Sequence, residues 1–511
     1  MKRILSVLFY LLAFGLFLPQ YAKCADWTFM VYLDGDNNLE DAGIDDFLEM
    51  SSVGSDSNVN IVVQFDRIPG EDSSFDNWTD CQRFLVTAGM TPTVANAISD
   101  WGDGTGGREV NMADPQTLID FIKWSMDNYP ARNYAVILWN HGGGWRVEYV
   151  PERPILRAVC WDDTSGGDSL YMSEVKSALN TIKTERQQVD LAGFDACLMS
   201  MTEVAYEIKD LANVMVASEA SEPGDGWPYD TIIEDLSALP TMSATDLGAT
   251  IVNRYGESYG SASETTQSAI DLSIMDTIAS CVNDLAAAMD SNKSEITAAR
   301  AGSQEYNCPE NIDLYHFADL LYIESSDPDI QTTAFDVMTA VESAVIAEYH
   351  GTWLPNSHGL AIYFPETETG FDSDYNGSII DFPADTQWDE FLSWYYSATD
   401  EITLLTPDNG AVLPESPPAT FAWEADSTYR FKLEFSPTSS FVFGFPTLTV
   451  PRQSLMTYTS TDAIQVDAWQ RIWKIIKRME QINGIIYWRV LGKPGPTAPE
   501  EPSEIRNFMI Q

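Results

Sequence analysis

The chain has 511 residues, more than one ordinary hydrophobic core holds, so we expect at least two domains. Hydrophobic residues make up 44% and charged residues 21%, which excludes an intrinsically disordered chain. The 28 basic and 77 acidic side chains give a formal net charge of −49, and nearly all of this excess lies before residue 400. Such a field repels nucleic acid and attracts cationic ligands, although solubility outside the cell would also explain it.

The first 25 residues are predicted to be a secretory signal peptide. Lys2 and Arg3 precede the apolar run ILSVLFYLLAFGLFL, which is short for a membrane span. We expect cleavage near residues 22–26. No later run is long and apolar enough to cross a bilayer, so the mature protein is expected to be soluble and secreted, periplasmic or at the cell surface.

Residues 26–398 alternate between strand-like runs and helical patterns, which predicts one α/β domain. Strands are expected at 27–34, 59–66, 133–140 and 189–197, with 358–365 as a late strand of the same sheet. Helices are expected at 114–130, 173–183 and 201–212, the first with Asp114 as its N-cap and Pro115 in its first turn. This order favours a doubly wound, mostly parallel sheet flanked by helices.

Residues 399–511 have a different texture and are predicted to form an all-β sandwich. The short runs YRFKLEFS, PTLTV and GIIYWRVLG lie among proline and Asn-Gly punctuation. In its pattern of short strands and turns, and in no specific motif, the segment resembles the fibronectin-III or Ig-like modules appended to secreted bacterial enzymes. Residues 467–482 are predicted to form a basic amphipathic helix that packs on the sandwich rather than on a membrane.

The chain holds only four histidines, His141, His316, His350 and His358, so any histidine chemistry depends on one of them. His141 follows a predicted strand in LWNHGGGW, at the carboxyl end of the sheet, where α/β proteins form ligand sites. His316 is expected inside a helix as a packed residue, and His350 at the end of a helix. His358 precedes a core strand and is the weakest rival.

The HGGG pattern also occurs in the oxyanion holes of serine esterases, so a nucleophilic serine is the first alternative. GESYG (256–260) matches the nucleophile-elbow pattern and would present Ser258. An elbow needs a buried strand directly before the serine, whereas SATDLGATIVNRY has helical spacing with Ser243 as a cap. The serine esterase therefore remains the minor interpretation.

Cys197 is the second candidate nucleophile. A strand runs into it, and a helix is expected soon after with Ser200 or Thr202 as its N-cap, so that the helix dipole would favour the thiolate. A small buried core cysteine is the alternative. His141 and Cys197 each end a predicted parallel strand, one crossover apart, so the sheet would place them side by side for nucleophilic catalysis. The other cysteines allow up to two disulfides and show no zinc-ligand spacing.

These motifs occur in one order along the chain: YLDGDNNLE, NHGGGW, CWDDTSGGDSLYMSEV, FDACLM, EPGDGWPY and GLAIYFP. Over roughly residues 26–395 the sequence resembles the clostripain family of cysteine peptidases, in the caspase, gingipain and legumain group. The resemblance implies a caspase-like fold, with His141 and Cys197 as the catalytic dyad. It also implies an oxyanion hole formed by the backbone amides of Gly142 and Cys197.

The same resemblance implies an endopeptidase that cleaves protein or peptide substrates after arginine or lysine, which requires an acidic specificity pocket. Asp195 lies two residues before Cys197, so strand alternation places it on the same side. Asp225 lies in the PGDGW turn, which resembles the pocket-lining loop of the family. A carboxylate at the pocket base pairs well with a guanidinium group, although Asp195 would also suit a helix-capping role.

Family members are often activated by self-cleavage between the histidine and the cysteine, and here Arg157–Ala158 is the better bond because Arg153 precedes a proline. We expect no cofactor to be required. Calcium is the candidate cation, although DGDNNLEDAGID (34–45) only faintly matches a calcium loop. A secreted binding protein with an inactive peptidase domain is the remaining alternative.

Overall fold

A computed structural model describes most of the chain. The described residues are 24–101, 107–145, 159–289, 293–372, 374–396, 403–413, 420–424, 430–439, 447–450, 457–459, 484–493, 501–503 and 505–510. Residues 1–23 of the predicted signal peptide, the Arg157 bond and the 467–482 helix lie outside these residues, while Ala25, the last residue of that peptide, begins the first strand. The chain divides into two compact units, residues 1–285 with 298–387, and residues 286–297 with 388–511.

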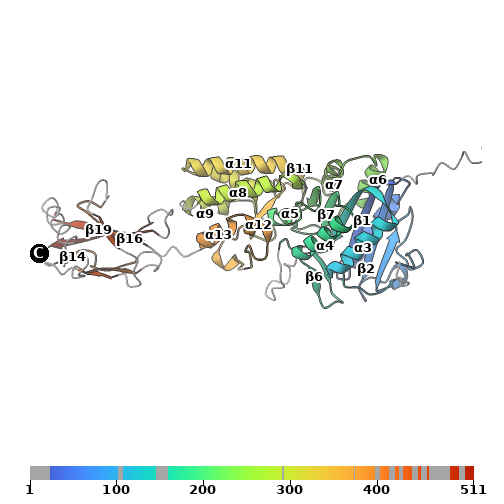
Figure 1. Ribbon diagram of the computed structural model, residues 1–511, viewed down its shortest axis with the longest axis horizontal. Helices are drawn as coiled ribbons and strands as arrows, with labels where there is room; N and C mark the ends of the chain where they lie inside the picture. The colour runs from blue at the N-terminus through green and yellow to red at the C-terminus, as the bar shows by residue number, and fades with distance from the viewer. Residues whose placement is uncertain are drawn as a thin grey trace, which may run out of the picture. The chain divides into compact units, whose positions relative to one another are not determined.

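The first unit is built on an eight-stranded sheet with the order β11-β9-β8-β7-β4-β1-β2-β3 (Figure 1). Its strands are β1 Ala25–Gly35, β2 Val59–Arg67, β3 Cys81–Leu85, β4 Ala131–Trp139, β7 Leu191–Asp195, β8 Val214–Ala217, β9 Thr266–Asp271 and β11 Val345–His350. The central strands β8, β7, β4, β1 and β2 run parallel. β3 on one edge and β9 near the other run antiparallel to them, and the outermost strand β11 pairs antiparallel with β9. The predicted mostly parallel α/β sheet is confirmed.

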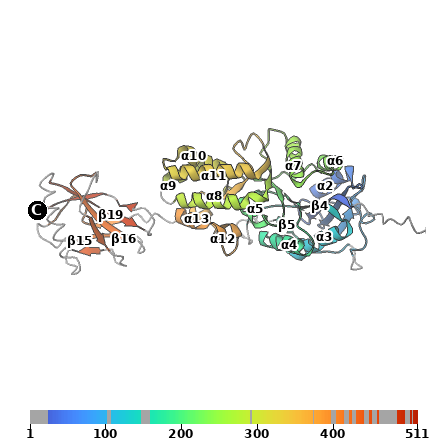
Figure 2. The same cartoon turned by 45° about the horizontal axis from the view of Figure 1, so that its top comes forward.

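Helices cover both faces of this sheet. On one face lie α2 Glu40–Val53, α6 Tyr229–Ala238 and α7 Ala244–Tyr259, and on the other α3 Pro115–Asn128, α4 Met172–Glu185 and α5 Thr202–Ile208 (Figures 1 and 2). Side chains of β1 alternate between the two layers, since Phe29 packs in the core with α2 and α6, whereas Tyr32 contacts Phe121 of α3. Burial on both faces explains why these strands are continuously apolar.

Local signals set the ends of the helices. The Asp114 side chain accepts a hydrogen bond from Gln116 N with proline at the first turn of α3, as predicted. Ser243 caps α7 through a reciprocal bond pair with Asp246. The predicted caps of α5 are wrong, because Met201 is its N-cap and α5 ends at Ile208.

Two predictions about the late part of this unit are wrong. Residues 358–365 do not join the main sheet, because β11 already pairs with the open edge of β9; instead β12 Ala361–Tyr363 pairs with β10 Asn311–Asp313. His350 ends a strand and not a helix, since α11 Pro328–Ala344 stops before the β-branched and aromatic residues of β11.

The remaining elements of the first unit are helical or short. They are η1 Phe75–Asn77, β5 Val159–Asp162, β6 Asp168–Leu170, η2 Leu272–Ile274, α10 Leu314–Glu324, η3 Glu368–Gly370 and α12 Asp381–Asp385, together with most of α8 Met275–Ala288 and half of α9 Lys293–Gly302. Helices α10 and α11 lie side by side (Figure 2). Both α8 and α9 extend across the division between the units.

The second unit contains α13 Trp388–Tyr396 and a group of short strands. These strands are β13 Thr403–Thr406, β14 Ala411–Leu413, β15 Thr420–Glu424, β16 Arg430–Ser436, β17 Thr447–Val450, β18 Thr457–Thr459, β19 Ile486–Lys493, β20 Glu501–Pro502 and β21 Arg506–Ile510. They form one three-stranded sheet and a larger one centred on β16, β19 and β21.

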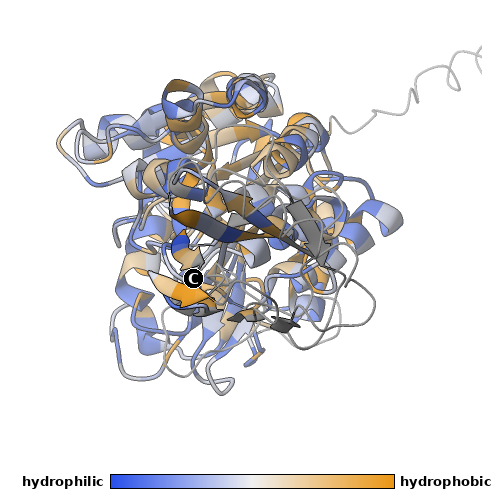
Figure 3. Ribbon diagram, turned by 90° about the vertical axis from the view of Figure 1, so that its left-hand side faces the viewer, coloured by the Kyte–Doolittle hydropathy of each residue, from blue (hydrophilic) through white to orange (hydrophobic). Residues whose placement is uncertain are grey.

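Across the protein as a whole, apolar residues concentrate in the strands and polar residues in the outer loops (Figure 3). Four buried rings of the strands of the second unit, Phe421, Phe435, Trp488 and Phe508, pack together.

None of the six cysteines, all of which are described, forms a disulfide. In the described part of the chain, no helix has the length and apolar character that crossing a membrane requires.

Candidate active site

The register of two adjacent parallel strands brings His141 and Cys197 together. Trp139 of β4 pairs with Asp195 of β7, and the backbone N–H of Asn140 donates to Asp195 O at 3.2 Å. His141 and Cys197 each lie two residues beyond this pair. Both line one cavity of about 90 Å³ at the carboxyl end of the sheet. The sequence prediction that they are neighbours agrees with this arrangement.

Gly142 packs against the backbone of Cys197 so closely that only glycine fits. A Cβ atom there would lie 2.3 Å from Cys197 O and 3.0 Å from Cys197 N. Any side chain would push the His141 segment away from the cysteine. Gly142 also forms a bridge to Val159.

The His141 ring is held from two sides. Its Nε2 lies 3.0 Å from Asn38 Oδ1, and the ring packs on Trp161 with centroids 4.8 Å apart. Asn140 ties the segment to the end of β1, because its side-chain amide donates to Asp34 Oδ2 at 2.7 Å. If Nε2 donates to Asn38, Nδ1 is the basic nitrogen of the neutral ring. Burial lowers the pKa of His141, which favours this neutral form.

Cys197 lies in the turn after β7 and is partly buried. Burial raises the pKa of its thiol, opposed in part by the hydrogen bond that Glu222 N donates to Sγ at 3.2 Å. The expected lowering by the helix dipole is wrong, because α5 begins only at Thr202 and has seven residues. The next residue, Leu198, has φ of 64°, a left-handed conformation that costs a leucine energy and is typical of functional turns.

Three acidic residues approach this cavity. Asp195 is only 4% exposed, and its Oδ2 accepts hydrogen bonds from Trp227 N and Tyr229 OH. Glu222 lines the cavity together with Asp195. Asp225 is exposed and is not among the described lining residues, although Gly224 and Gly226 on either side of it are.

A second acidic group, the Asp36 cluster of Asp36, Glu109 and Asp162, lies beyond the end of β1. Carboxylate oxygens of the three residues lie within 4.8 Å of one another, with Asp36 and Asp162 buried and Glu109 exposed. Thr164 Oγ1 contacts both Asp36 and Glu109. Asp36 Oδ1 is buried and has no hydrogen-bond partner among the described residues. The 34–45 stretch forms no continuous loop, because α2 begins at Glu40.

The rival candidates have structural settings. Ser258 lies inside α7 and not on a strand-to-helix turn, so no nucleophile elbow forms. His316 lies in α10, as predicted, and its Nδ1 accepts a hydrogen bond from Gln304 N. His350 pairs with Glu348, and His358 with the buried Asp313.

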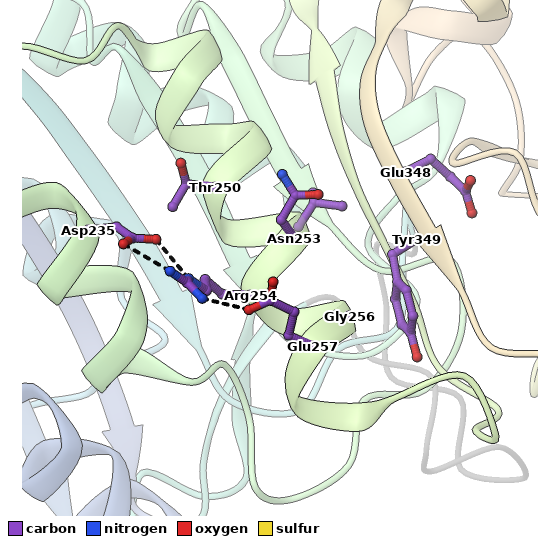
Figure 4. A pocket seen from close by; sticks show the side chains of 9 residues that line it. Asp235, Thr250, Asn253, Arg254, Gly256, Glu257, Glu348 and Tyr349 are labelled. Carbon is purple, nitrogen blue, oxygen red and sulfur yellow. Dashed lines mark hydrogen bonds and ion pairs between the residues drawn. The ribbon is translucent and has the colours of Figure 1, made fainter. Parts of the chain in front are cut away.

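A larger cavity of about 480 Å³ lies beside α7, away from His141 and Cys197 (Figure 4). Its one arginine, Arg254, is already paired with Asp235 and Glu257. Tyr349 and Glu348 of β11 line the opposite side (Figure 4). With its cation fully paired, this cavity offers no reactive group comparable to Cys197.

Sequence reasoning missed the residues that hold the site from other parts of the chain. Asn38 and Trp161 fix the His141 ring, and Glu222 contacts the thiol of Cys197. Glu222 opens the EPGDGWPY motif, so its position was visible in the sequence while its contact was not.

Comparisons with known proteins identify the family and the fold. The model of the clostripain family matches residues 31–395. Clostripain from Hathewaya histolytica is 27% identical over 432 residues, covering 72% of this chain and 79% of clostripain. A secreted C11 cysteine protease from Bacteroides thetaiotaomicron, solved with an irreversible peptide inhibitor, has a TM-score of 0.53 at 17% identity, covering 72% of this chain and all of that one. The C11 protease iotapain from the same organism has a TM-score of 0.52 at 15% identity, with 71% and 99% covered. The two structures share the fold.

Proposed function

Because the chain belongs to the clostripain family of cysteine endopeptidases, we propose that His141 and Cys197 form its catalytic dyad. One observation carries the proposal: both residues lie two positions beyond the same strand pair and line one cavity. A histidine and a thiol in one cavity at the end of a parallel sheet suit nucleophilic attack on a carbonyl.

The raised pKa of Cys197 and the lowered pKa of His141 favour a neutral thiol and a neutral imidazole in the resting enzyme. The thiol proton then passes to His141 Nδ1 as Sγ attacks the peptide carbonyl carbon. Backbone amides of Gly142 and Cys197 bind the oxyanion. The C–N bond breaks, His141 protonates the leaving amine, and water hydrolyses the thioester.

Three variants test this assignment on a fluorogenic peptide with arginine at P1 and on a p-nitrophenyl ester. Cys197→Ala and His141→Ala are expected to lose at least about 10³-fold in kcat, since removing a nucleophile or its base removes the covalent route. Ser258→Ala is expected to retain wild-type rates. Ester activity lost only in Ser258→Ala would establish the serine esterase, and no activity in any assay would favour an inactive binding protein.

We propose that the substrate side chain at P1 is basic. Asp195 supplies a buried carboxylate beside Cys197, and the described lining residues include no lysine or arginine. Asp225 is exposed and lies in sequence between Gly224 and Gly226, which line the cavity. A carboxylate held in a small cavity favours a guanidinium or ammonium group over a neutral side chain.

Calcium fits the Asp36 cluster, since three carboxylates close together are the ligands that this cation takes. The unpartnered, buried Asp36 Oδ1 also suits a cation. A bound calcium ion would neutralise the three carboxylates there. It would also steady the segment that places Trp161 on the His141 ring.

We further propose export through a signal peptide at residues 1–25, self-cleavage at Arg157–Ala158 and a fibronectin-III-like sandwich at residues 399–511. N-terminal sequencing of purified wild type and Cys197→Ala tests the first two together. Loss of the leader in both proteins, with a new terminus at Ala158 only in wild type, is the expected result. Identical chains that are intact between His141 and Cys197 would contradict self-cleavage.

A further inference from the structure

The lining of the active-site cavity contains a second carboxyl besides Asp195, that of Glu222. Glu222 comes from the loop after β8, and its backbone N–H donates to Cys197 Sγ at 3.2 Å. Its Oε1 accepts a hydrogen bond from Gln267 Nε2 of β9 at 3.1 Å. Its Oε2 is buried and meets no donor group among the described residues. One carboxylate oxygen is therefore anchored and the other is available.

Asp195 is anchored in the same manner. Its Oδ2 accepts from Trp227 N at 3.2 Å and from Tyr229 OH at 2.8 Å. Gly226 closes over it, since a Cβ atom there would lie 3.2 Å from Asp195 Oδ2 and 2.9 Å from Asp46 Oδ2. Rigid donors thus hold the carboxyl in place without supplying a positive charge.

The Asp195 and Glu222 carboxyls lie within hydrogen-bonding reach of each other, and burial raises the pKa of both. The ionisable groups facing them are Asp46 and Glu49 from α2, Tyr229 from α6, Tyr255 and Tyr259 from α7, the Cys197 thiol, and His141, whose lowered pKa favours the neutral ring. None of these is cationic. Two carboxyls in contact without a cation hold one proton between them.

We propose that Asp195 and Glu222 form a specificity-pocket pair that carries one shared proton when the pocket is empty and loses it when a basic P1 side chain enters. The carboxyl O–H bond breaks, the proton passes to solvent water, and the pair gains one negative charge. The incoming cation then meets the available Glu222 oxygen together with Asp195. This inference rests on the proposed basic specificity and adds Glu222 as a specificity-determining residue.

The pair predicts how substrate binding depends on pH. Below the apparent pKa of the pair, the cation must displace a proton, so KM for an arginine substrate falls up to tenfold for each unit rise in pH. Above that pKa, KM becomes flat. A substrate with citrulline at P1, which has the shape of arginine without its charge, has no such dependence.

The experiment measures kcat and KM between pH 5 and pH 9 on matched peptides with arginine or citrulline at P1. Wild type, Glu222→Gln and Glu222→Asp are compared with Glu234→Gln, which removes an exposed acid of α6 that is not among the residues lining the cavity. Glu222→Gln keeps the backbone donor to Cys197. It is expected to lower the arginine-to-citrulline ratio of kcat/KM about 10- to 100-fold, mainly through KM, and to move the pH break downward. Glu222→Asp is expected to recover part of the ratio.

An unchanged ratio and pH break in Glu222→Gln would overturn the pair while leaving basic specificity intact. A wild-type enzyme that does not discriminate arginine from citrulline would instead overturn the proposed basic specificity. Thermal unfolding and thiol titration of each variant show whether it folds. If Glu222→Gln does not fold, Glu222→Asp provides the test. Its KM for the arginine peptide is expected to rise three- to tenfold, and an unchanged KM would contradict the pair.

Discussion

Two groups of carboxyl side chains lie near the carboxyl ends of sheet strands, and their surroundings differ. The specificity-pocket pair, Asp195 and Glu222, lines a cavity shared with Cys197. In the Asp36 cluster, three carboxylates face one another, and Asp162 is tied down by the backbone N–H groups of Met112 and Ser165. An open cavity suits a cation that arrives with a substrate, whereas converging carboxylates suit a cation that stays. The same side-chain chemistry can therefore serve two roles.

The largest effect is expected at the pair. Asp195→Asn removes the charge beside Cys197 and leaves an incoming guanidinium group without its main partner. We expect kcat/KM for an arginine peptide to fall about 10²- to 10³-fold, the cost of an unpaired buried charge. The loss for the citrulline peptide should be much smaller, and steady-state kinetics on both peptides measures the difference.

Glu109→Gln, in the Asp36 cluster, is the matched comparison for this variant. This substitution changes the net charge of the protein by the same amount as Asp195→Asn, but outside the cavity. The arginine-to-citrulline ratio of kcat/KM should therefore stay within about threefold of the wild-type ratio. A comparable fall in the ratio for both variants would show that the overall negative field, and not a local contact, selects the substrate.

Glu203 is a third kind of buried carboxyl, because it accepts hydrogen bonds and no charged neighbour contributes to its pKa shift. Its Oε1 accepts from Tyr363 N and Tyr375 OH, while burial raises its pKa to about 7. Between about pH 4.5 and 7 the unfolded chain has released this proton and the folded chain has kept it, so stability falls as pH rises. The glutamine in Glu203→Gln cannot ionise. Between pH 5 and pH 8 the free energy of unfolding of this variant is therefore expected to fall by about 1–3 kcal/mol less than that of wild type.

Urea unfolding at the two pH values measures that difference. Gln at this position carries an amide that needs a partner, so Glu203→Gln is expected to be about 1 kcal/mol less stable than wild type at pH 5. Equal pH dependence in both proteins would show that Glu203 is ionised in the folded state.

The sequence was sufficient to place His141 and Cys197 beside each other because both follow apolar strands. The runs before His141 and Cys197 are buried on both faces, and the single crossover between them makes the two strands neighbours. Gly142 could also be predicted as a position of close backbone approach, since three glycines follow the histidine. Strand periodicity correctly placed Asp195 on the same side as Cys197.

Contacts made by loops could not be predicted in the same way. Glu222 reaches Cys197 only because the segment after β8 folds back over the end of β7, and no local pattern encodes that path. The strand that contains His350 was missed because its composition also suits the end of a helix, and pairing with β9 decides between them. Apolar residues of β12 indicated burial but not the partner strand.

The smallest effect concerns calcium at the Asp36 cluster. Wild-type protein in millimolar calcium is expected to gain about 1 kcal/mol over protein in EDTA, a rise of about 2 °C in Tm, provided that calcium exceeds its dissociation constant several-fold. Glu109→Gln should lose most of this gain, because it removes the one exposed carboxylate of the cluster and leaves the anchored Asp162 intact. Glu234→Gln should keep it, which separates binding at the cluster from general screening of a chain with charge −49. Differential scanning calorimetry at constant ionic strength decides the matter, and an equal calcium response in both variants would place the cation elsewhere in the molecule.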